Sequence, residues 1–101
     1  MKIPVGAYKY DMRLVKKVSD AGDHGICDTE KKTIRIERGS DDTLSTAFHE
    51  LFHAELYEAG VHCATEWNDG VEEITVDLLS RSVARNYDKI LAFLKKNKQK
   101  L

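Results

Sequence analysis

The sequence lacks the features that mark several classes of protein. It has one proline, two cysteines and no apolar run near the roughly 18 residues that a membrane-spanning helix requires. The first residues also lack the apolar stretch of roughly 7–15 residues found in a signal peptide. We therefore expect one small domain over residues 1–101 that works in the cytoplasm, makes no membrane contact and keeps both cysteines as free thiols.

The most informative absence is one of positive charge. The chain has 16 Lys and Arg against 17 Asp and Glu, so a formal net charge of −1 says little by itself. Residues 39–80, however, contain no Lys or Arg and ten acidic residues, whereas both flanking segments are basic. Such a block is poorly suited to gripping phosphate and well suited to holding a metal cation. The lysines of residues 95–101 are typical of a solvated tail, so we do not expect a nucleic-acid partner.

The first third of the chain is expected to form strands. Residues 7–18 are rich in Tyr and Val, which favours a strand. Residues 26–37 hold a short strand candidate, a turn and the sequence TIRIE, whose alternating isoleucines are typical of a half-buried strand. This segment is therefore expected to be a hairpin. The predicted sheet is small and antiparallel, with two or three strands.

The rest of the chain is expected to form two helices packed on that sheet, so the predicted fold class is α+β. The first helix is expected over residues 43–59, with Gly60 just after its end. The second should run from about residue 71 to residue 96, either unbroken or interrupted near Asn86. The side chains that could cap the first helix are Ser40, Asp41 and Asp42.

The chemistry is indicated by the segment His49-Glu50-Leu51-Phe52-His53, which has the pattern H-E-x-x-H. Residues four apart lie on one face of a helix, so both imidazoles can reach one tetrahedral metal ion. Glu50 lies beside the pair, where its carboxylate can accept the proton of an activated water without binding the metal. The motif therefore predicts a Zn²⁺ site with His49 and His53 as ligands and Glu50 as the catalytic base.

A catalytic zinc also needs a third protein ligand and an open fourth position. Glu73 is favoured because it shares a helix stripe with Asp77 between two apolar sectors, where an unpaired carboxylate is costly. The metzincin pattern fails, since Leu56 and Ala59 stand where it requires Gly and His. The alternatives that stay open are His62, Cys63 and Glu72.

The spacing of these residues resembles that of the gluzincin metallopeptidases, the thermolysin-like group. The short chain and its segments TAFHELFHAEL and EEITVDLLS look more like the minimal ImmA/IrrE-type domains common in phages, prophages and mobile elements. The resemblance implies that Glu73 is the third zinc ligand and that Asp77 orients His49. It also implies that the chain works in the host cytoplasm if a phage encodes it. Phe52 departs from the small residue common at its position.

The resemblance implies two further features. No histidine matches the late proton donor of the thermolysin-type lobe, so another residue must stabilise the oxyanion. Tyr57, one turn beyond His53, is the first candidate, ahead of His24 and His62. In gluzincins an edge strand above the zinc pairs with an extended peptide, and the strand over residues 33–37 is its expected counterpart.

The predicted function is that of a zinc-dependent endopeptidase that cleaves a protein substrate, for example a regulatory protein such as a repressor. The alternative is a zinc-binding protein-interaction domain in which peptidase activity is vestigial or latent. Basic residues near the ends of the chain suggest nucleic-acid binding only weakly.

Overall fold

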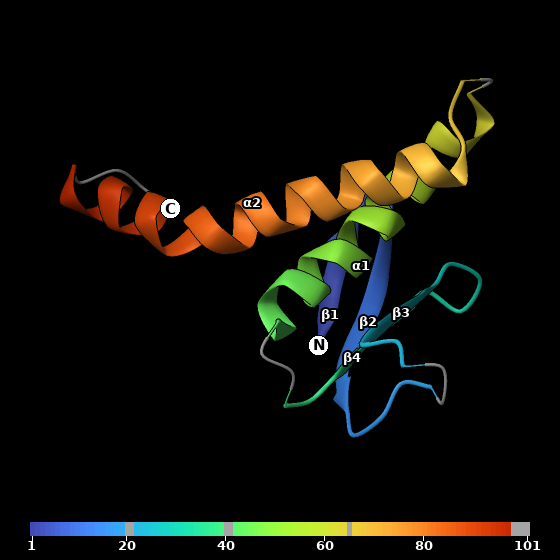
Figure 1. Cartoon of the computed structure of the whole chain (residues 1–101), viewed down its shortest axis with the longest axis horizontal. Coiled ribbons are helices and arrows are strands. Elements are labelled where there is room, and N and C mark those ends of the chain that lie inside the picture. Colours follow the sequence, from blue (N-terminus) through green and yellow to red (C-terminus); the bar gives the residue numbers. More distant parts are fainter. Residues whose placement is uncertain (20–21, 40–41, 65, 98–101) are drawn as a thin grey trace.

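In the computed structural model of the chain, the strands come first and the helices follow (Figure 1), so the predicted α+β class is confirmed. The structure describes residues 1–19, 22–39, 42–64 and 66–97. Its elements are β1 (Lys2–Val5), β2 (Tyr8–Val15), β3 (Gly25–Asp28), β4 (Thr33–Glu37), α1 (Thr43–Glu58), the short 3-10 helix η1 (Val61–Cys63) and α2 (Asp69–Lys96).

The sheet has four strands in the order β1-β2-β4-β3. The predicted hairpin is confirmed, since β3 and β4 pair antiparallel with Cys27 opposite Ile34. However, β2 and β4 run parallel, so the expectation of a wholly antiparallel sheet with two or three strands is wrong. The extra strand is β1, which is only four residues long and contains Pro4, so it carries little strand signal. As an edge strand it tolerates the missing donor of proline.

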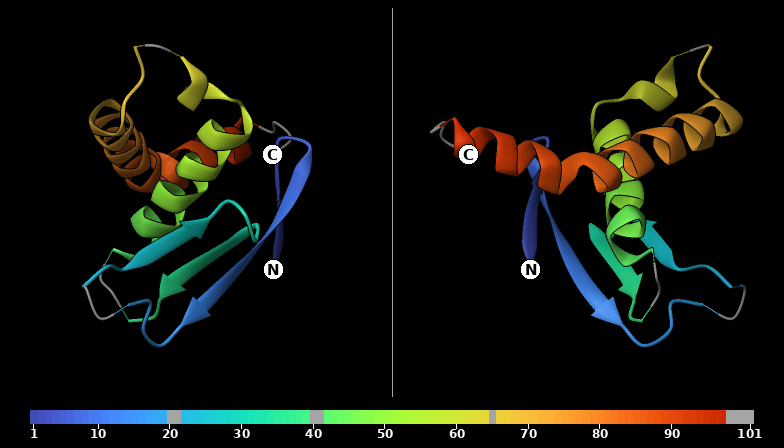
Figure 2. Two further views of the ribbon diagram at one scale, coloured as in Figure 1. Left: turned by 90° about the vertical axis from the view of Figure 1, so that its right-hand side faces the viewer. Right: turned by 60° about the vertical axis from the view of Figure 1, so that its left-hand side comes forward.

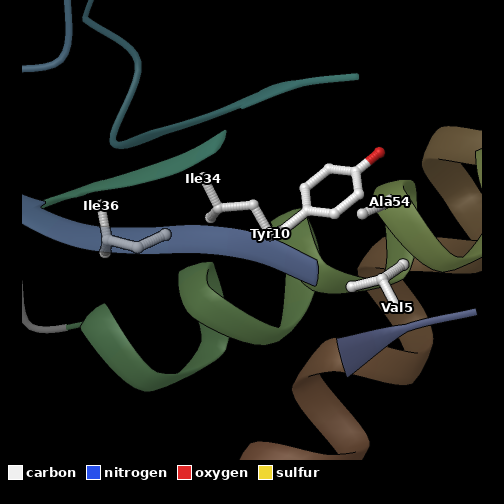
Figure 3. Packing of buried hydrophobic residues seen from close by; sticks show 5 residues of the cluster. All are labelled: Val5, Tyr10, Ile34, Ile36 and Ala54. Carbon is white, nitrogen blue, oxygen red and sulfur yellow. The ribbon is translucent and has the colours of Figure 1, made fainter. Parts of the chain in front are cut away.

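Side chains from β1, β2, β4 and α1 meet in a small core between the sheet and α1 (Figure 3). Ile34 and Ile36 are buried and Arg35 between them is exposed, as their alternation predicted. The hydroxyl of Tyr10 lies 3.4 Å from Oε2 of Glu58, whose carboxylate also forms an ion pair with Lys32 at 2.9 Å. This pair ties the turn before β4 to the end of α1.

Both helices form close to where the sequence places them. Asp42 occupies the N-cap position of α1, but its side chain makes no capping hydrogen bond. Gly60 follows the helix with a φ of 77°, a backbone conformation that glycine adopts without strain. Helix α2 begins two residues earlier than expected, because Oδ1 of Asn68 accepts a hydrogen bond from the N–H of Val71 and caps it. It continues through Asn86 without a break. The other two cap candidates, Ser40 and Asp41, lie outside the described residues.

Helix α1 lies against the sheet, and α2 crosses over α1 rather than resting on the sheet (Figure 2). Phe48 of α1 anchors this crossing, since its ring packs against Tyr87 with 6.1 Å between the centroids. Phe52 stacks on Phe48 at the same separation. The large side chain at position 52 therefore belongs to an aromatic group between the helices.

Because α2 has a neighbour on one side only, the prediction of two apolar sectors around Glu73 is largely wrong. In one sector Ile74 and Leu78 are 73% and 65% exposed; in the other Val76 is fully buried but Leu79 is 48% exposed. Glu73 itself is exposed, so burial cannot be the reason for its position. Lys95 and Lys96 of the predicted tail form the last turn of α2. Neither described helix is both long and apolar enough to cross a membrane.

Candidate metal centre

Two imidazoles and one carboxylate from different helices converge on one point. His49 and His53 stand one turn apart on α1, and their Nε2 atoms are 3.2 Å apart. Glu73, in the first two turns of α2, places Oε1 2.9 Å from Nε2 of His53 and Oε2 3.5 Å from Nε2 of His49. One ligand atom from each residue lies within 4.8 Å of the others. The structure thus contains a His-His-Glu group (His49, His53 and Glu73) that could hold a metal ion.

The spacing of these atoms suits a small tetrahedral ion. With ligand bonds of about 2.0–2.1 Å, two ligands of a tetrahedral zinc lie about 3.3–3.4 Å apart. The two Nε2 atoms are 3.2 Å apart, Oε1 of Glu73 lies 2.9 Å from Nε2 of His53, and Oε2 lies 3.5 Å from Nε2 of His49. With one oxygen of Glu73 taken as the ligand, all three ligand atoms lie within 4.8 Å of one another. Two nitrogen atoms whose lone pairs face each other repel and do not normally lie this close. A cation or a proton shared between them holds them at this distance. The donor chemistry and the distances therefore fit a bound divalent ion.

The orientation of His53 is set by a carboxylate that sequence reasoning treated only as an alternative ligand. Nδ1 of His53 lies 2.5 Å from Oε2 of Glu72, and an ionised carboxylate at this distance requires a proton on Nδ1. This contact directs Nε2 toward His49 and Glu73. The other oxygen of Glu72 accepts a hydrogen bond from the indole N–H of Trp67 at 3.0 Å. Glu72 is thus a positioning residue for His53. Two adjacent glutamates at a helix start, with a tryptophan five residues earlier, were the only sequence signal for this.

The charge of Glu72 is maintained by these same contacts. Burial alone would raise the pKa of the Glu72 carboxyl, but the hydrogen bonds from Trp67 and His53 outweigh burial and lower it. An ionised carboxylate is the better acceptor for both donors, and it strengthens a ligating imidazole. Burial and the nearby His53 lower the pKa of His49, which favours the neutral imidazole that a metal requires.

Glu50 lies beside the His-His-Glu group and is only 8% exposed. It lines a cleft of about 750 Å³, and burial raises the pKa of its carboxyl. The cleft lies between the start of β3, the first half of α1 and the middle of α2. Its lining residues are Asp23, His24, Gly25, Asp42, Leu44, Ser45, Thr46, His49, Glu50, Asp77, Arg81, Ala84 and Arg85. The predicted base and one predicted ligand therefore face the same open space.

The absence of a side chain at Gly25 lets α1 approach β3 at this point. A Cβ atom there would lie 2.7 Å from Cγ2 of Thr46 and 2.9 Å from Cγ of Glu50. We expect Gly25→Ala to lower the free energy of unfolding by about 1–3 kcal/mol, because such overpacking forces neighbours out of place. Urea denaturation measures this. Gly70→Ala in α2 is the control and should cost less, because alanine favours a helix and a Cβ atom there meets only Oδ1 of Asn68, at 3.2 Å. Equal stability of both variants would contradict the close packing at Gly25.

Asp77 and Tyr57 are not brought into contact with the metal-binding atoms in the described part of the chain. Asp77 lines the cleft near His49, but its carboxylate forms an ion pair with Nη2 of Arg81 at 3.3 Å. Tyr57 stacks on His62, with 4.8 Å between ring centroids, and neither lines the cleft. The roles assigned to Asp77 and Tyr57 therefore stay predictions.

The other residues singled out in the sequence have simpler places. His24 lines the cleft. Cys27 and Cys63 are free thiols, as expected. Burial and nearby carboxylates, Glu50 first among them, raise the pKa of the Cys27 thiol to about 12. Cys27 therefore remains a neutral thiol in the core.

The prediction that the strand over residues 33–37 is the edge strand beside the site is wrong. β4 is an interior strand, paired on both sides by β2 and β3. The edge next to the cleft belongs to β3, whose first residue, Gly25, lines it. The sequence suggested β4 because it directly precedes the helix, but the chain inserts β4 between β2 and β3.

No family model, curated protein or solved structure matches the chain. Its function is therefore inferred from the chemistry of the site.

Proposed function

We propose that the chain is a zinc-dependent endopeptidase that hydrolyses peptide bonds of a protein substrate. The observation that supports this most directly is the His-His-Glu group, whose ligand atoms lie within 4.8 Å of one another beside the buried carboxylate of Glu50. Two histidines and one glutamate form a donor set of catalytic zinc sites, which leave a coordination position open for water or substrate. The resemblance to minimal gluzincin-type domains points the same way, and it suggests a regulatory protein in the host cytoplasm as the substrate.

Different residues of the chain bind the metal, transfer the proton and position a ligand. His49, His53 and Glu73 hold the zinc, which when bound polarises the scissile carbonyl and lowers the pKa of a water molecule. Glu50 accepts a proton from the attacking water at a carboxylate oxygen and returns it to the leaving amine. Glu72 keeps Nε2 of His53 pointing toward the metal position. Glu50 is only 8% exposed and lines the cleft, so its carboxylate is positioned beside the space that a water and the substrate would occupy.

The free edge of β3 is the best place for the substrate backbone. A peptide added beside β3 would extend the sheet and run into the cleft at Gly25, close to Glu50. Main-chain hydrogen bonds of this kind give affinity with little dependence on the substrate sequence. Selectivity must then come from side chains in the cleft.

A metal-binding interaction domain is the second candidate, and one observation favours it. Tyr57, the first choice for stabilising the oxyanion, is engaged in a stack with His62 rather than lining the cleft. A site that binds zinc but lacks an oxyanion donor would hold a partner without cleaving it.

Metal analysis combined with digestion separates the two candidates. We expect one equivalent of zinc per chain, confirmed by anomalous scattering at the zinc edge between His49, His53 and Glu73. The zinc-loaded chain should cleave unfolded casein, lose this activity after dialysis against a chelator, and regain it when zinc is added back. Stoichiometric zinc without cleavage of casein or of a random peptide library would favour the interaction domain, and absence of metal binding would refute both.

A further inference from the structure

The α2 wall of the cleft carries two arginines that the catalytic proposal does not use. Arg81 and Arg85 both line the cleft, together with His49 and Glu50. They are the first cations after the stretch of residues 39–80 that lacks Lys and Arg. Because they are four residues apart, they lie on one face of α2, one turn from each other. The cleft therefore has a cationic side close to a site that is otherwise acidic.

The direction of these side chains brings their charge toward the metal centre. Long side chains on a helix lean toward its N-terminus, and in α2 that direction leads from Arg81 to Glu73. Arg81 confirms this, since its Nη2 reaches back to within 3.3 Å of Oδ2 of Asp77. Arg81 follows Glu73 by eight positions, which correspond to about 12 Å of helix. An extended peptide covers the same distance with about three or four residues.

Both arginines have donors to spare. A guanidinium has five N–H donors, and Arg81 uses one nitrogen in its ion pair while its side chain stays 70% exposed. Arg85 is exposed and has no ion pair among the interactions of the described residues. The opposite wall carries Asp23 and Asp42, which repel an anion from that side. Asp77 also lines the cleft, on the α2 wall, but its carboxylate is paired with Arg81. A negatively charged group in the cleft is therefore left with Arg85 and the remaining N–H donors of Arg81.

We infer that Arg81 and Arg85 form a binding site for a carboxylate of the substrate, a few residues from the bond that is cleaved. This assignment rests on the proposed peptidase function for its position relative to the scissile bond. The carboxylate belongs either to an acidic side chain or to the C-terminus of the peptide, since both present the same planar anion to a guanidinium. The site makes the enzyme selective for acidic substrates, which main-chain pairing with β3 cannot do.

Binding can be measured apart from catalysis with the Glu50→Gln chain loaded with zinc. The probes are fluorescein-labelled ten-residue peptides that carry one Asp or, as the matched neutral form, one Asn, scanned over all positions. Each is made with a free and with an amidated C-terminus. We expect the best Asp peptide, or the free C-terminus, to bind about tenfold more tightly than its neutral form in fluorescence anisotropy, a difference of about 1.4 kcal/mol. The position of the effect identifies which carboxylate is recognised.

Substitutions then connect the preference to the two arginines. In an Arg81→Gln/Arg85→Gln background the preference should fall below about twofold, whereas Lys95→Gln, which removes a charge from α2 outside the cleft, should leave it unchanged. The Arg85→Lys variant should retain part of the preference for the charged peptide. Equal binding of charged and neutral peptides, no binding of any peptide, or a preference that survives the double substitution would overturn the inference. Circular dichroism of each variant confirms that α2 is intact.

The outcomes also keep this inference apart from the proposed function. A chain with native Glu50 that cleaves neutral and acidic peptides equally would support the peptidase and overturn the carboxylate site. A chain that cleaves nothing but shows the arginine-dependent preference would support the site and overturn the peptidase.

Discussion

Replacing Glu50 with glutamine is expected to lower peptide hydrolysis by about 10²–10⁴-fold while zinc binding is unchanged. Glutamine has nearly the same shape but cannot accept a proton at its amide, so the attacking water is no longer activated. The contact between position 50 and Gly25 depends on Cγ, which both side chains share. Neutralising a buried carboxylate whose pKa is already raised by burial should not unfold the chain.

The measurement is kcat/KM on a cleaved peptide, alongside the zinc content of each variant. Glu55→Gln is the matched control, because Glu55 lies on the same helix but is exposed and does not line the cleft. It should keep the activity of the parent chain. If Glu50→Gln cleaves as fast as Glu55→Gln, Glu50 is not the base and the proposed mechanism is wrong.

Substitutions at the two adjacent glutamates of α2 should weaken zinc binding to different degrees. Glu73→Gln removes an anionic ligand and should raise the dissociation constant more than 100-fold. Glu72→Gln should raise it about 10–100-fold, the usual effect of losing a residue that orients a ligating histidine. The effect of Glu72→Gln has a specific cause: one oxygen of Glu72 accepts a hydrogen bond from His53 and the other accepts one from Trp67. A glutamine has one acceptor oxygen, so one of these hydrogen bonds is lost.

Competition with a chromogenic zinc chelator measures both constants. Glu66→Gln, an exposed glutamate in the loop before α2, is the control and should bind zinc like the parent chain. Trp67→Phe should reproduce a smaller part of the Glu72→Gln effect, because it removes only the indole donor. A larger loss for Glu72→Gln than for Glu73→Gln would mean that the ligand and the positioning residue have been assigned the wrong way round.

The local parts of the site could be predicted because a single helix determines them. His49 and His53 are four residues apart in α1, so the helical repeat places both imidazoles on one face of the helix, where their Nε2 atoms are 3.2 Å apart. Likewise, the alternating isoleucines of β4 predicted their own burial. The glycine that follows α1 and the hairpin of β3 and β4 are also local features.

Which of Glu72 and Glu73 faces the two histidines does not follow from local sequence. Adjacent helical residues point about 100° apart, so the crossing of α2 over α1 decides which one faces the histidines. The sequence favoured Glu73 on the expectation of a buried stripe, yet Glu73 is exposed. The preference for Glu73 agrees with the geometry, but for a different reason: the start of α2 lies beside the two histidines, so that the exposed Glu73 carboxylate reaches both Nε2 atoms.

By itself, then, the sequence determined the α+β order of the elements, the histidine pair and the adjacent carboxylate, because these depend on contacts within a few residues. Only the tertiary structure decided that β3 rather than β4 borders the cleft, that Glu72 holds His53, and that Arg81 and Arg85 share a cavity with Glu50. These depend on strand order and on the angle between two helices, which follow from packing around Phe48 and the sheet core. The stretch without Lys and Arg, residues 39–80, contains the whole His-His-Glu group, and the two arginines just beyond it line the cleft from α2.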